Sequence, residues 1–524
     1  MFSLMQSATV YGVEGKEIAV EVDIASGLPQ IAVVGLPDPA VRESVERVRA
    51  AIKNSGFTFP MERITVNLAP AVLRKEGTAF DLAIAAGILA ASGQLNAAHF
   101  HHTMMLGELS LNGSIRPVTG VLAMIEQAKK SGIRRVLLPI ANAPEAAWIA
   151  GMELFGITHL MDLRPSGSEG LEAIRYTAEP CSGSKGYIGL LTENKPLLSP
   201  DCGDYSDVIG QQLAKRALII AAAGRHNVLF SGPPGTGKTM MIRRLPSILP
   251  PLSEQEAIEV TKIYSAAGKL STDNQGLIAA APFRAPHHTI STGGLVGGGS
   301  VPKPGEVTLA HHGVLYLDEL PEFSRQTLEV LRQPLEDGIV TIARSSAVFH
   351  FPARLILAVS FNPCPCGFSG HETIDKRCIC TDAVIARYKS KLSGPLLDRI
   401  DIQLEVPQPI DLGRSLTNSH SKNLSSEEMR QQVVAARAYQ KERLSELKIN
   451  TNAGLSGSAL HRAMLIRQDA AELLGHALQT LPISMRAHDR IMRLSRTVAD
   501  VEGSPYVEVQ HIAEAIQYRK LCKL

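Results

Sequence analysis

This sequence has almost no excess of positive or negative charge. Its 524 residues include 53 Lys and Arg against 51 Asp and Glu, which gives a formal net charge of +2. This balance excludes a polycationic protein that would bind nucleic acid over its whole surface. Any contact with nucleic acid must therefore come from a local patch built from a few Lys or Arg residues.

Long hydrophobic runs are missing as well. The longest apolar stretch, Ala79–Ala91, contains Asp81 and is too short to span a bilayer. The N-terminus lacks a basic segment followed by an apolar core, so we expect no signal peptide. With 45% hydrophobic and 20% charged residues, the sequence predicts a cytoplasmic protein without a membrane partner. The length predicts roughly three or four domains.

Cysteine is scarce, and its seven residues are unevenly distributed. Four of them form two C-x-C pairs separated by eleven residues, Cys364-Pro-Cys366 and Cys378-Ile-Cys380. In a reducing compartment this spacing favours a metal site over disulfides. Four thiolates from two short loops suit a closed tetrahedral Zn²⁺ site. Four free thiols, with the first pair present for packing, are the alternative interpretation.

What the sequence does contain is a phosphate-binding motif of the form G-x-x-x-x-G-K-[ST]. It reads Gly232-Pro233-Pro234-Gly235-Thr236-Gly237-Lys238-Thr239. The motif follows a predicted strand, Asn227–Phe230, and opens a predicted helix, Lys238–Leu245. Glycines let backbone N–H groups approach phosphate oxygens, and the helix N-terminus adds its positive end. We expect Lys238 to reach the β- and γ-phosphates of ATP and Thr239 to bind Mg²⁺. A glycine-rich turn without a ligand is the alternative.

Two acidic residues follow a continuous apolar strand further along the chain. The strand is Val314–Leu317, and Asp318 and Glu319 come directly after it. We expect the carboxylate of Asp318 to reach the same Mg²⁺ ion, and that of Glu319 to orient and deprotonate an attacking water. The alternative is a pair of acids that caps the segment Leu320–Phe323. The phosphate-binding motif makes the catalytic interpretation the stronger one.

The predicted elements divide the chain into four parts. Residues 1–163 form an α/β unit, 164–200 a linker, 201–408 a second α/β unit and 409–524 a mostly helical region. In the second unit, the apolar run Leu355–Val359 predicts a strand of a parallel sheet that is buried on both faces. The alternating segment Ile400–Val406 predicts an edge strand. In the first unit, Asn112-Gly113 predicts a β-hairpin with a two-residue turn.

These motifs resemble those of the Mg-chelatase-like AAA+ ATPases. The resemblance extends to Asn-Pro-Cys-Pro-Cys-Gly at 362–367 and Ser-Gly-Pro-Leu-Leu-Asp-Arg-Ile-Asp at 393–401. Over its whole length the chain resembles the ComM/YifB family within this group. The resemblance implies an α/β AAA+ P-loop core, in which helices cover both faces of a parallel sheet, followed by an α-helical lid. It also implies ATP and Mg²⁺ as cofactors and a hexameric ring of identical subunits.

Further site residues are implied by the same resemblance. Asn362 fits the sensor-1 residue that helps to place the attacking water. Arg399 fits an arginine finger that reaches the γ-phosphate in a neighbouring subunit, and Arg486 fits the sensor-2 arginine. Ile209, in the segment Val208–Gln211, fits a position that packs on adenine. A surface ion pair is the alternative for each arginine.

Two insertions are typical of this branch of AAA+ proteins. Residues 283–305 resemble a helix-2 insert, and 338–351 resemble a pre-sensor-1 hairpin with Arg344 at its tip. In related DNA helicases such a hairpin projects a basic residue into a central channel. One Arg per subunit around a ring would grip single-stranded or branched DNA without sequence preference. A solvated turn is the alternative.

The N-terminal unit resembles the proteolytic domain of Lon proteases, an α/β domain of the ribosomal S5 domain 2-like type. The resemblance lies in residues 74–79 and 107–115. Lon chemistry needs a Ser that is activated by a Lys, but Ala79 and Leu122 stand at those positions. We therefore expect a catalytically inert module for assembly or DNA contact. A weaker idea is that Arg74 and Lys75 form a second basic rim.

The function implied by the resemblance is an ATP-driven DNA motor. It would be a branch-migration helicase that extends heteroduplex when imported DNA recombines during natural transformation. A magnesium-chelatase ATPase subunit is the alternative, and a protease or chaperone is a third possibility. The adjacent histidines at 287–288 and 311–312 are poor chelates, because neighbouring strand residues point to opposite faces. We expect polar packing near a subunit interface for both pairs.

Overall fold

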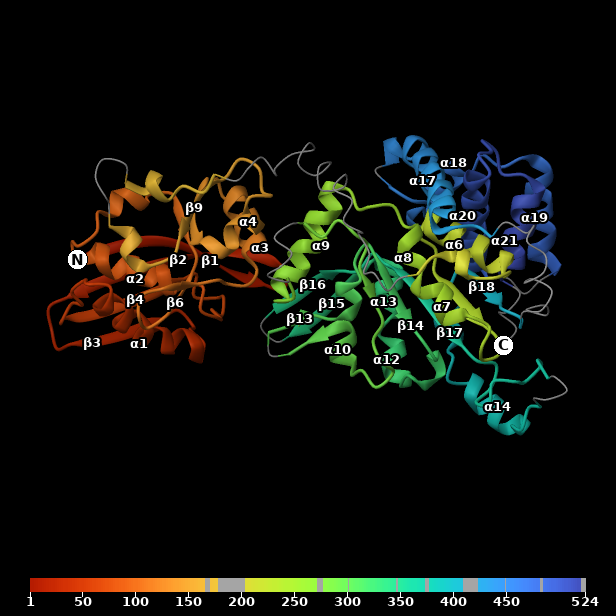
Figure 1. Cartoon of the computed structure of the whole chain (residues 1–524), viewed down its shortest axis with the longest axis horizontal. Helices are drawn as coiled ribbons and strands as arrows, with labels where there is room; N and C mark the ends of the chain where they lie inside the picture. The colour runs from red at the N-terminus through yellow and green to blue at the C-terminus, as the bar shows by residue number, and fades with distance from the viewer. Residues whose placement is uncertain are drawn as a thin grey trace. The chain divides into compact units, whose positions relative to one another are not determined.

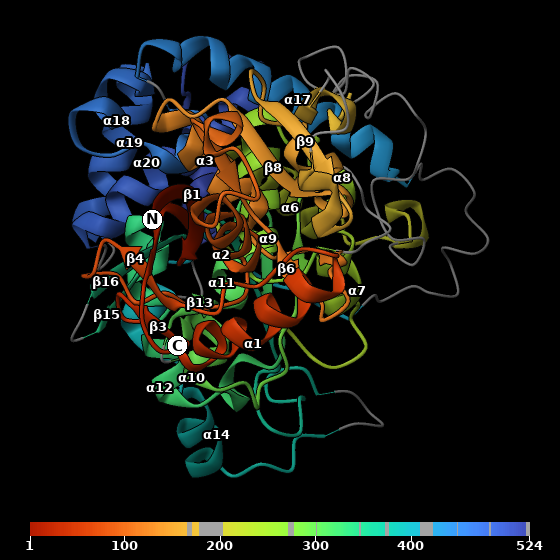
Figure 2. The same cartoon turned by 90° about the vertical axis from the view of Figure 1, so that its left-hand side faces the viewer.

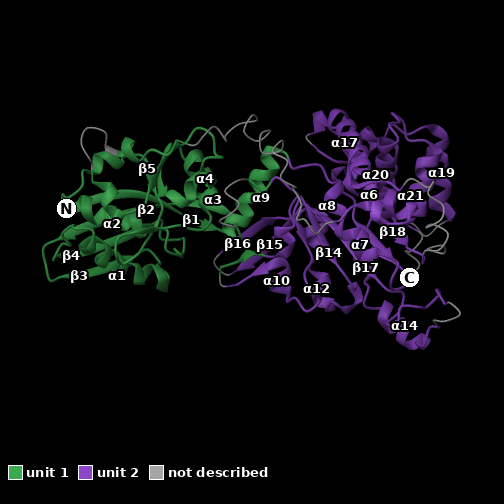
Figure 3. Cartoon of the chain, viewed as in Figure 1, with its two compact units in different colours: residues 1–194, 253–278, 300–304 green, residues 195–252, 279–299, 305–524 purple. Residues whose placement is uncertain are grey.

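The computed structural model describes residues 1–164, 170–177, 203–270, 277–299, 301–344, 347–372, 377–408, 423–447, 449–480 and 484–519. The chain forms two compact units, which Figure 3 shows in different colours. The first comprises Met1–Asn194, Ser253–Ile278 and Ser300–Pro304, and the second comprises Lys195–Leu252, Ala279–Gly299 and Gly305–Leu524. Among the described residues, no helix combines the length and the apolar character needed to cross a bilayer.

A seven-stranded mixed sheet forms the centre of the first unit (Figure 1). In spatial order its strands are β3 (Gln30–Val34), β4 (Arg63–Ala69), β2 (Glu14–Ala25), β1 (Phe2–Tyr11), β5 (Thr103–Met105), β8 (Arg135–Pro139) and β9 (Glu153–Ile157). The pairs β1–β2 and β2–β4 are antiparallel, and the other four pairs are parallel.

Helices cover both faces of this sheet. Successive strand residues point to opposite faces, and Met104 and Met105 of β5 accordingly belong to two different buried clusters. The cluster of Met105 includes side chains from the first two helices, and that of Met104 includes side chains from the third. The helices of the unit are α1 (Pro39–Asn54), α2 (Asp81–Ala91), α3 (Val121–Lys130), α4 (Ala143–Ala146) and α9 (Glu254–Ala266).

Sequence patterning does not predict β1, although this strand lies in the middle of the sheet. Three of its buried residues are polar, namely Ser3, Ser7 and Thr9. Ser3 Oγ donates to Gly87 O at 2.7 Å, and Ser7 Oγ donates to Met105 O at 2.8 Å. Buried hydroxyls are tolerated when they are hydrogen-bonded. The strand therefore forms without the hydrophobic alternation by which strands are recognised.

The predicted hairpin around Asn112-Gly113 exists, but its predicted two-residue turn is wrong. The paired strands are short, β6 (Glu108–Leu109) and β7 (Ile115–Arg116). Ser110 N donates to Ser114 O at 2.9 Å beyond them, so the connection is longer. The preceding strand, β5, ends at Met105 and belongs to the main sheet.

Helix α9 belongs to the first unit, although its sequence lies within the predicted second unit. Lys262 Nζ of α9 lies 2.8 Å from Glu126 Oε2 on α3. Ser265 Oγ donates to Glu145, whose pKa is raised by burial. The chain therefore returns to its N-terminal unit after the phosphate-binding motif.

Part of the segment predicted as a linker also belongs to this unit. Residues 170–177 include a short 3-10 helix, η4 (Gly170–Ile174). Leu171 is buried in the cluster that contains Met105, and Arg175 forms a β-bridge with Phe155 of β9. The rest of the predicted linker, apart from Arg164, lies outside the described residues.

A five-stranded parallel sheet forms the centre of the second unit. In spatial order its strands are β11 (Phe283–Arg284), β14 (Val314–Leu317), β17 (Ile356–Phe361), β10 (Val228–Ser231) and β18 (Ile402–Glu405). Every residue of β10, β14 and β17 is buried, as the continuous apolar runs predict. The predicted edge position of β18 is confirmed. The predicted helix-2 insert, residues 283–305, begins with β11. Its first two residues are therefore part of the central sheet.

Helices of the second unit lie around this sheet, and those near the C-terminus gather in a cluster that shares its hydrophobic core with the sheet. Figures 1 and 2 both show α17 to α20 gathered together. Asp500 is buried within this cluster and accepts hydrogen bonds from Arg443 and Arg496. The helices are α6 (Gln212–Gly224), α7 (Lys238–Arg243), α8 (Leu245–Ile248), α10 (Thr292–Val296), α11 (Glu306–Leu309), α12 (Arg325–Glu329), α13 (Arg332–Asp337), α14 (Asp382–Lys389), α15 (Gly394–Leu397), α17 (Ser426–Arg443), α18 (Gly457–Met464), α19 (Gln468–Thr480), α20 (Met485–Val501) and α21 (Val509–Gln517).

The remaining strands are short and lie outside the two large sheets. β15 (Ile339–Arg344) and β16 (Ala347–Pro352) pair antiparallel, which confirms the predicted hairpin. β12 (Gly297–Gly298) and β13 (Lys303–Pro304) lie in the predicted insert. Because the strands of the large sheet in the second unit are parallel, the loops that follow them meet at one edge, where ligands of such sheets bind.

Candidate nucleotide-binding site

Glycine conformation shapes the loop that follows β10. Gly232, Gly235 and Gly237 have φ values of 155°, 82° and 85°. A Cβ on Gly232 would lie 2.3 Å from Val406 O. The backbone that follows the neighbouring strand β18 therefore leaves no room for a side chain at this position. Left-handed glycines turn successive N–H groups toward one concavity, which is a geometry suited to phosphate oxygens.

The ammonium group of Lys238 lies inside this loop. Its Nζ donates to Gly232 O at 2.7 Å, to Pro233 O at 2.8 Å and to Asn362 Oδ1 at 3.3 Å. Burial lowers the pKa of Lys238 to about 8, and the nearby carboxylate of Asp318 opposes that shift. Lys238 and Asn362, which lie 124 positions apart in the sequence, are thus brought together.

A hydroxyl and a carboxylate lie side by side next to the loop. Thr239 Oγ1 donates to Asp318 Oδ2 at 3.1 Å. Tyr316 OH donates to Thr239 Oγ1 at 3.2 Å and shares a 2.8 Å hydrogen bond with Ser360 Oγ, which in turn donates to Asp318. Hydroxyl and carboxylate oxygens are the ligands that Mg²⁺ prefers, so this donor set fits the expected ion.

Tyr316 and Ser360 are site residues that the sequence does not single out. Both lie inside buried apolar strands, β14 and β17, and no motif marks them. Burial raises the pKa of the Tyr316 phenol, so this group remains a neutral donor. The only indication in the sequence that either residue belongs to the site is its polar group within a run of apolar residues.

Glu319 directly follows Asp318 in a strained backbone conformation. Its φ is 52°, in the left-handed region that non-glycine residues rarely adopt. Its N–H donates to Asp318 Oδ1 at 3.0 Å, and its side chain is exposed. It precedes the 3-10 helix η7 (Leu320–Glu322) without forming a side-chain cap. The alternative role as a cap of this segment is therefore wrong for Glu319.

Arg399 lies at the opposite end of the sheet from the glycine loop. Its carbonyl oxygen accepts from Asn227 Nδ2 at 3.0 Å, and Asn227 directly precedes β10. The loop begins after β10, at Gly232, and a strand of this length separates the two ends by roughly 16 Å. The guanidinium group pairs with Glu336 of α13. Arg399 is therefore remote from the phosphate-binding loop of its own chain.

Arg486 is exposed in the first turn of α20. Within the described part of the chain it forms no hydrogen bond or ion pair. Arg490 of the same helix lies at the Arg399 end instead, where its Nη1 donates to Asp401 Oδ1 at 2.6 Å and to Arg399 O at 2.8 Å. Burial would raise the pKa of Asp401, but the Arg490 guanidinium holds it well below its usual range.

A polar cavity of about 370 Å³ lies at this same end of the sheet. Its walls include Arg225, His312, Arg354 and Arg490. Arg354 N donates to His311 Nδ1 at 3.0 Å, and an Arg225 nitrogen lies 3.0 Å from His312 Nδ1. The histidine pair thus has the polar surroundings expected for it.

The other histidine pair and Ile209 lie on the surface. His287 Nδ1 lies 3.0 Å from Thr289 Oγ1, and the rings of His287 and His288 are 4.0 Å apart. Ile209 is 38% exposed, whereas the preceding residue, Val208, is buried. An apolar side chain next to the start of α6 is thus available to contact a flat ligand.

Arg344 ends strand β15 and is exposed. Its Nη2 donates to Gly299 O at 3.1 Å, so the end of the hairpin touches the predicted helix-2 insert. The two residues between β15 and β16, Ser345 and Ser346, lie outside the described residues.

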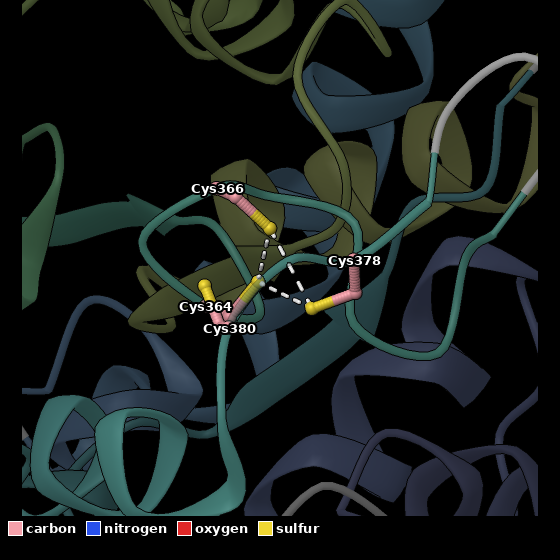
Figure 4. Close-up of side chains that lie close together, drawn as sticks. All are labelled: Cys364, Cys366, Cys378 and Cys380. Atoms are coloured by element: carbon pink, nitrogen blue, oxygen red, sulfur yellow. Dashed lines mark hydrogen bonds between the residues drawn. The ribbon is translucent and has the colours of Figure 1, made fainter.

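The four cysteines form one cluster (Figure 4). Sulfur–sulfur distances are 3.3 Å for Cys364–Cys366, 3.5 Å for Cys366–Cys378 and 3.8 Å for Cys364–Cys378. All four sulfurs, including that of Cys380, lie within 4.8 Å of one another, and all four cysteines are free. Such a set fits a tetrahedral metal site.

Backbone hydrogen bonds surround one sulfur of the cluster. Cys364 Sγ accepts from Gly367 N at 3.2 Å and from Ser369 N at 3.4 Å. N–H groups aimed at a sulfur stabilise a thiolate ligand from outside the metal's own coordination. The surroundings of Cys364, like the donor set, fit a bound cation.

The two positions predicted to correspond to a Lon catalytic pair are apolar and buried. Ala79 and Leu122 belong to the same buried cluster, that of Met104. The predicted basic rim is wrong for Lys75, which is fully buried and donates to Pro70 O. Burial lowers the pKa of Lys75, and only Arg74 of the two residues is exposed.

Comparison with known proteins identifies relatives of every part of the chain. The family described as magnesium chelatase, subunit ChlI, matches residues 204–411. The family described as subunit ChlI of Mg-chelatase matches 20–142, and the ChlI C-terminal family matches 423–519.

Individual relatives extend over the full length. The competence protein ComM of Haemophilus influenzae is 41% identical over 529 residues, which covers 100% of this chain and 98% of the relative. YifB of Salmonella typhimurium is 40% identical, with the same coverage of 100% and 98%. A Lon protease of Roseiflexus castenholzii is 28% identical over 138 residues, which covers 25% of this chain and 17% of the protease. The N-terminal region is therefore Lon-like.

Proposed function

Because the chain belongs to the ComM/YifB family of Mg-chelatase-like AAA+ proteins, we propose that it is an ATPase that drives movement along DNA. The observation that carries this proposal is the meeting of Lys238, Thr239, Asp318 and Asn362 at one edge of the parallel sheet. These groups supply the charge, the metal ligands and the polar sensor that phosphoryl transfer needs.

The chemistry follows from the positions of these groups. Lys238 and the glycine loop would bind phosphate oxygens, while Thr239 and Asp318 would hold Mg²⁺, which would supply positive charge to the phosphates. Glu319 accepts a proton from the attacking water, and Asn362 orients that water. Ile209 contacts adenine, and Arg486 contacts the nucleotide from the helical lid.

The placement of Arg399 supports an active site shared between subunits. An arginine at the far end of the sheet is about one strand length from its own loop, which supports a role at a neighbour's nucleotide. Head-to-tail contacts of this kind form a ring when the rotation between neighbouring subunits closes. We propose a homohexamer in which each Arg399 completes the next subunit's site.

DNA is the polymer that we propose as the partner. The name of the relative ComM refers to competence, and Arg344 lies exposed at the end of a hairpin that contacts the helix-2 insert. A ring of such arginines binds phosphates without reading sequence. The proposed activity is branch migration that extends heteroduplex during natural transformation, in the cytoplasm.

Zn²⁺ is the metal that we propose for the four cysteines. Closely spaced thiolates with N–H donors directed at Cys364 support this assignment. We expect one Zn²⁺ per chain in protein purified without chelator, as measured by elemental analysis. Folded, active protein without bound metal would contradict the assignment, and the ATPase proposal would be unaffected.

The decisive experiment measures ATP hydrolysis with and without four-way DNA. We expect branched DNA to raise the rate, and Glu319→Gln to lower it by about 10²–10⁴-fold while ATP still binds. Glu322→Gln is the matched control, since this acid lies three positions further on, in η7. The ATPase proposal fails if Glu319→Gln and Glu322→Gln behave alike.

A second experiment separates DNA binding from hydrolysis. Arg344→Ala should abolish stimulation by DNA and branch migration but retain the basal ATPase rate. Arg325→Ala is the control, because Arg325 is also exposed, at 79%, and lies elsewhere in the unit. Stimulation by a protein partner alone, with no response to any DNA, would favour the chelatase-like alternative.

A further inference from the structure

The cysteine cluster touches the phosphate-binding loop. A Cβ on Gly367 would lie 2.6 Å from Pro234 Cδ and 3.1 Å from Pro234 Cγ, so the Gly367 backbone packs directly on the loop. Gly367 has a φ of 89° and donates its N–H to Cys364 Sγ at 3.2 Å. Gly367 therefore donates a hydrogen bond to the sulfur of a proposed metal ligand and also contacts the phosphate-binding loop.

The start of the same loop carries the polar sensor. Asn362 lies two residues before Cys364, and its Oδ1 accepts from Lys238 Nζ at 3.3 Å. Only Pro363 separates the two residues, so Cys364 and Asn362 belong to one short segment. This segment links the cysteine cluster to a contact with the phosphate-binding lysine.

The end of the cysteine loop returns to the same residue. Helix α14 starts two residues after Cys380, and the side chain of its Tyr388 approaches the backbone of Asn362. Burial raises the pKa of Tyr388, and the nearby carboxylates of Glu322 and Glu319 add to that shift. Both ends of the loop between Cys364 and Cys380 are therefore anchored at the catalytic edge of the sheet.

We propose that metal binding by the four cysteines positions the phosphate-binding loop and Asn362, so that metal binding and ATP binding are thermodynamically coupled. This inference rests on the proposed ATP and metal sites. A cation joins the segment after Asn362 to the segment before α14 and offsets repulsion among four thiolates. Without it, the contact of Gly367 with Pro234 and the approach of Tyr388 to the Asn362 backbone lose their common anchor. Gly367 and Tyr388 act as positioning residues.

Coupling of this kind is reciprocal, which makes it measurable without a mutant. If the metal raises the affinity for ATP by some factor, ATP must raise the affinity for the metal by the same factor. We expect about fivefold or more in each direction. The first arm compares binding of a fluorescent, non-hydrolysable ATP analogue to Zn²⁺-loaded and Zn²⁺-depleted protein. The second arm follows the Zn²⁺ affinity with a chelating dye, with and without the analogue.

Two glycines in the same loop provide matched variants. Gly367 and Gly370 both have left-handed backbones, with φ values of 89° and 76°, but a Cβ on Gly370 would meet nothing within 4 Å. Gly367→Ala should retain one Zn²⁺ per chain and bind the ATP analogue at least about fivefold more weakly. Gly370→Ala carries similar backbone strain and should match the natural protein in both measurements. Circular dichroism checks that both variants are folded.

The outcomes separate this inference from the proposals beneath it. Equal affinity of loaded and depleted protein for the analogue would overturn the coupling and leave the metal as a local structural link. Equal behaviour of the two alanine variants would overturn the role of the Gly367 contact. Absence of metal would overturn both the coupling and the metal site but not the ATPase. Failure of the loaded natural protein to bind ATP would overturn the proposed function itself.

Discussion

The ammonium group of Lys238 lies among carbonyl oxygens of its own loop, close to Asp318 and Asn362. This arrangement keeps the loop compact and holds the lysine where phosphates would bind. Its cost is partial desolvation of the charge, which lowers the lysine pKa to about 8. A residue that is ordinarily charged at every physiological pH therefore titrates near neutrality.

ATP binding should consequently depend on pH. Phosphates favour the charged form of Lys238, so above pH 8 binding must be accompanied by proton uptake. We expect the dissociation constant for ATP to rise about tenfold between pH 7.5 and pH 9, because the free lysine loses its proton in that range. Calorimetry in two buffers with different ionisation enthalpies measures the proton uptake. An affinity that is constant over this range, in protein shown to be folded at each pH, would contradict the prediction.

Tyr316 should tune the metal requirement without making direct contact with phosphate. Its hydroxyl bonds to Thr239 and Ser360, the two hydroxyls next to Asp318. Tyr316→Phe leaves these partners less constrained, so we expect a higher Mg²⁺ concentration for half-maximal ATPase and a loss of about 1 kcal/mol in stability. Titration with Mg²⁺ at saturating ATP tests this. Tyr439→Phe, at a residue of α17 that is 46% exposed and outside this network, is the comparison.

Motifs predict site residues well where the chemistry demands a particular side chain. Lys238, Thr239 and Asp318 were selected from their motifs, and the structure brings them together. Tyr316 and Ser360 are not predicted as site residues, because each lies in an apolar strand and its hydrogen-bond partners are distant in sequence. The contact of Gly367 with Pro234 is equally hidden, since nothing local indicates it.

At the level of elements, the phosphate-binding loop depends on the strand that ends beside it. Gly232 lies against the backbone oxygen of Val406, just beyond β18, whereas Gly235 faces open space. Both have positive φ values, 155° and 82°. The two positions therefore separate the effect of backbone strain from that of crowding.

Alanine at these two positions should have unequal consequences. Gly232→Ala places Cβ 2.3 Å from Val406 O, so the loop or the strand end must shift, at about 1–3 kcal/mol beyond the strain itself. Gly235→Ala should show the strain alone, about 1–2 kcal/mol. Urea unfolding of both variants measures the difference. Equal destabilisation would mean that the loop adapts freely.

The sequence predicts helices and strands correctly where the pattern of apolar residues matches the pattern of buried side chains. The apolar runs of β14 and β17 and the hairpin β15–β16 follow this rule. β1 does not, since its inward serines satisfy their hydroxyls on Gly87 and Met105. The Asn112-Gly113 pair indicated a turn correctly but not its length.

On the scale of the whole molecule, the proposed role of Arg399 implies that each active site is completed by a neighbouring subunit. Arg399 is held at the far end of the sheet by Asn227 and by Glu336. If a neighbour supplies this arginine, each active site contains Glu319 from one subunit and Arg399 from the next. Glu319→Gln and Arg399→Ala then remove groups on opposite sides of the subunit interface. Neither variant alone retains any complete site.

Mixed assemblies of these two variants should therefore regain activity. In a randomly mixed ring about one contact in four pairs an intact Glu319 site with an intact Arg399. We expect co-expressed, co-purified Arg399→Ala and Glu319→Gln subunits to hydrolyse ATP at up to about a quarter of the natural rate. Mixtures of Glu319→Gln with a Lys238→Ala variant serve as the control, because both changes disable the same site. Recovery in the control, or none in the test mixture, would exclude an arginine that acts between subunits.

The discontinuous first unit is the feature that the sequence could least predict. Lys262 and Glu126 lie 136 positions apart, and neither belongs to a recognisable motif. Local patterns place α9 as a helix of the second unit, but its contacts assign it to the first. Only tertiary packing distinguishes the two.

The return of α9 to the Lon-like unit also determines how this protein can be dissected. A truncation that begins near residue 203 would retain α9 but remove α3 and Glu126, the surface on which it rests. Apolar groups such as Ile258, which packs against the cluster of Met104, would then face water. A shortened gene product could thus aggregate or lose activity even if the deleted region takes no part in catalysis. Chimeras between relatives should exchange residues 1–164 together with 253–278.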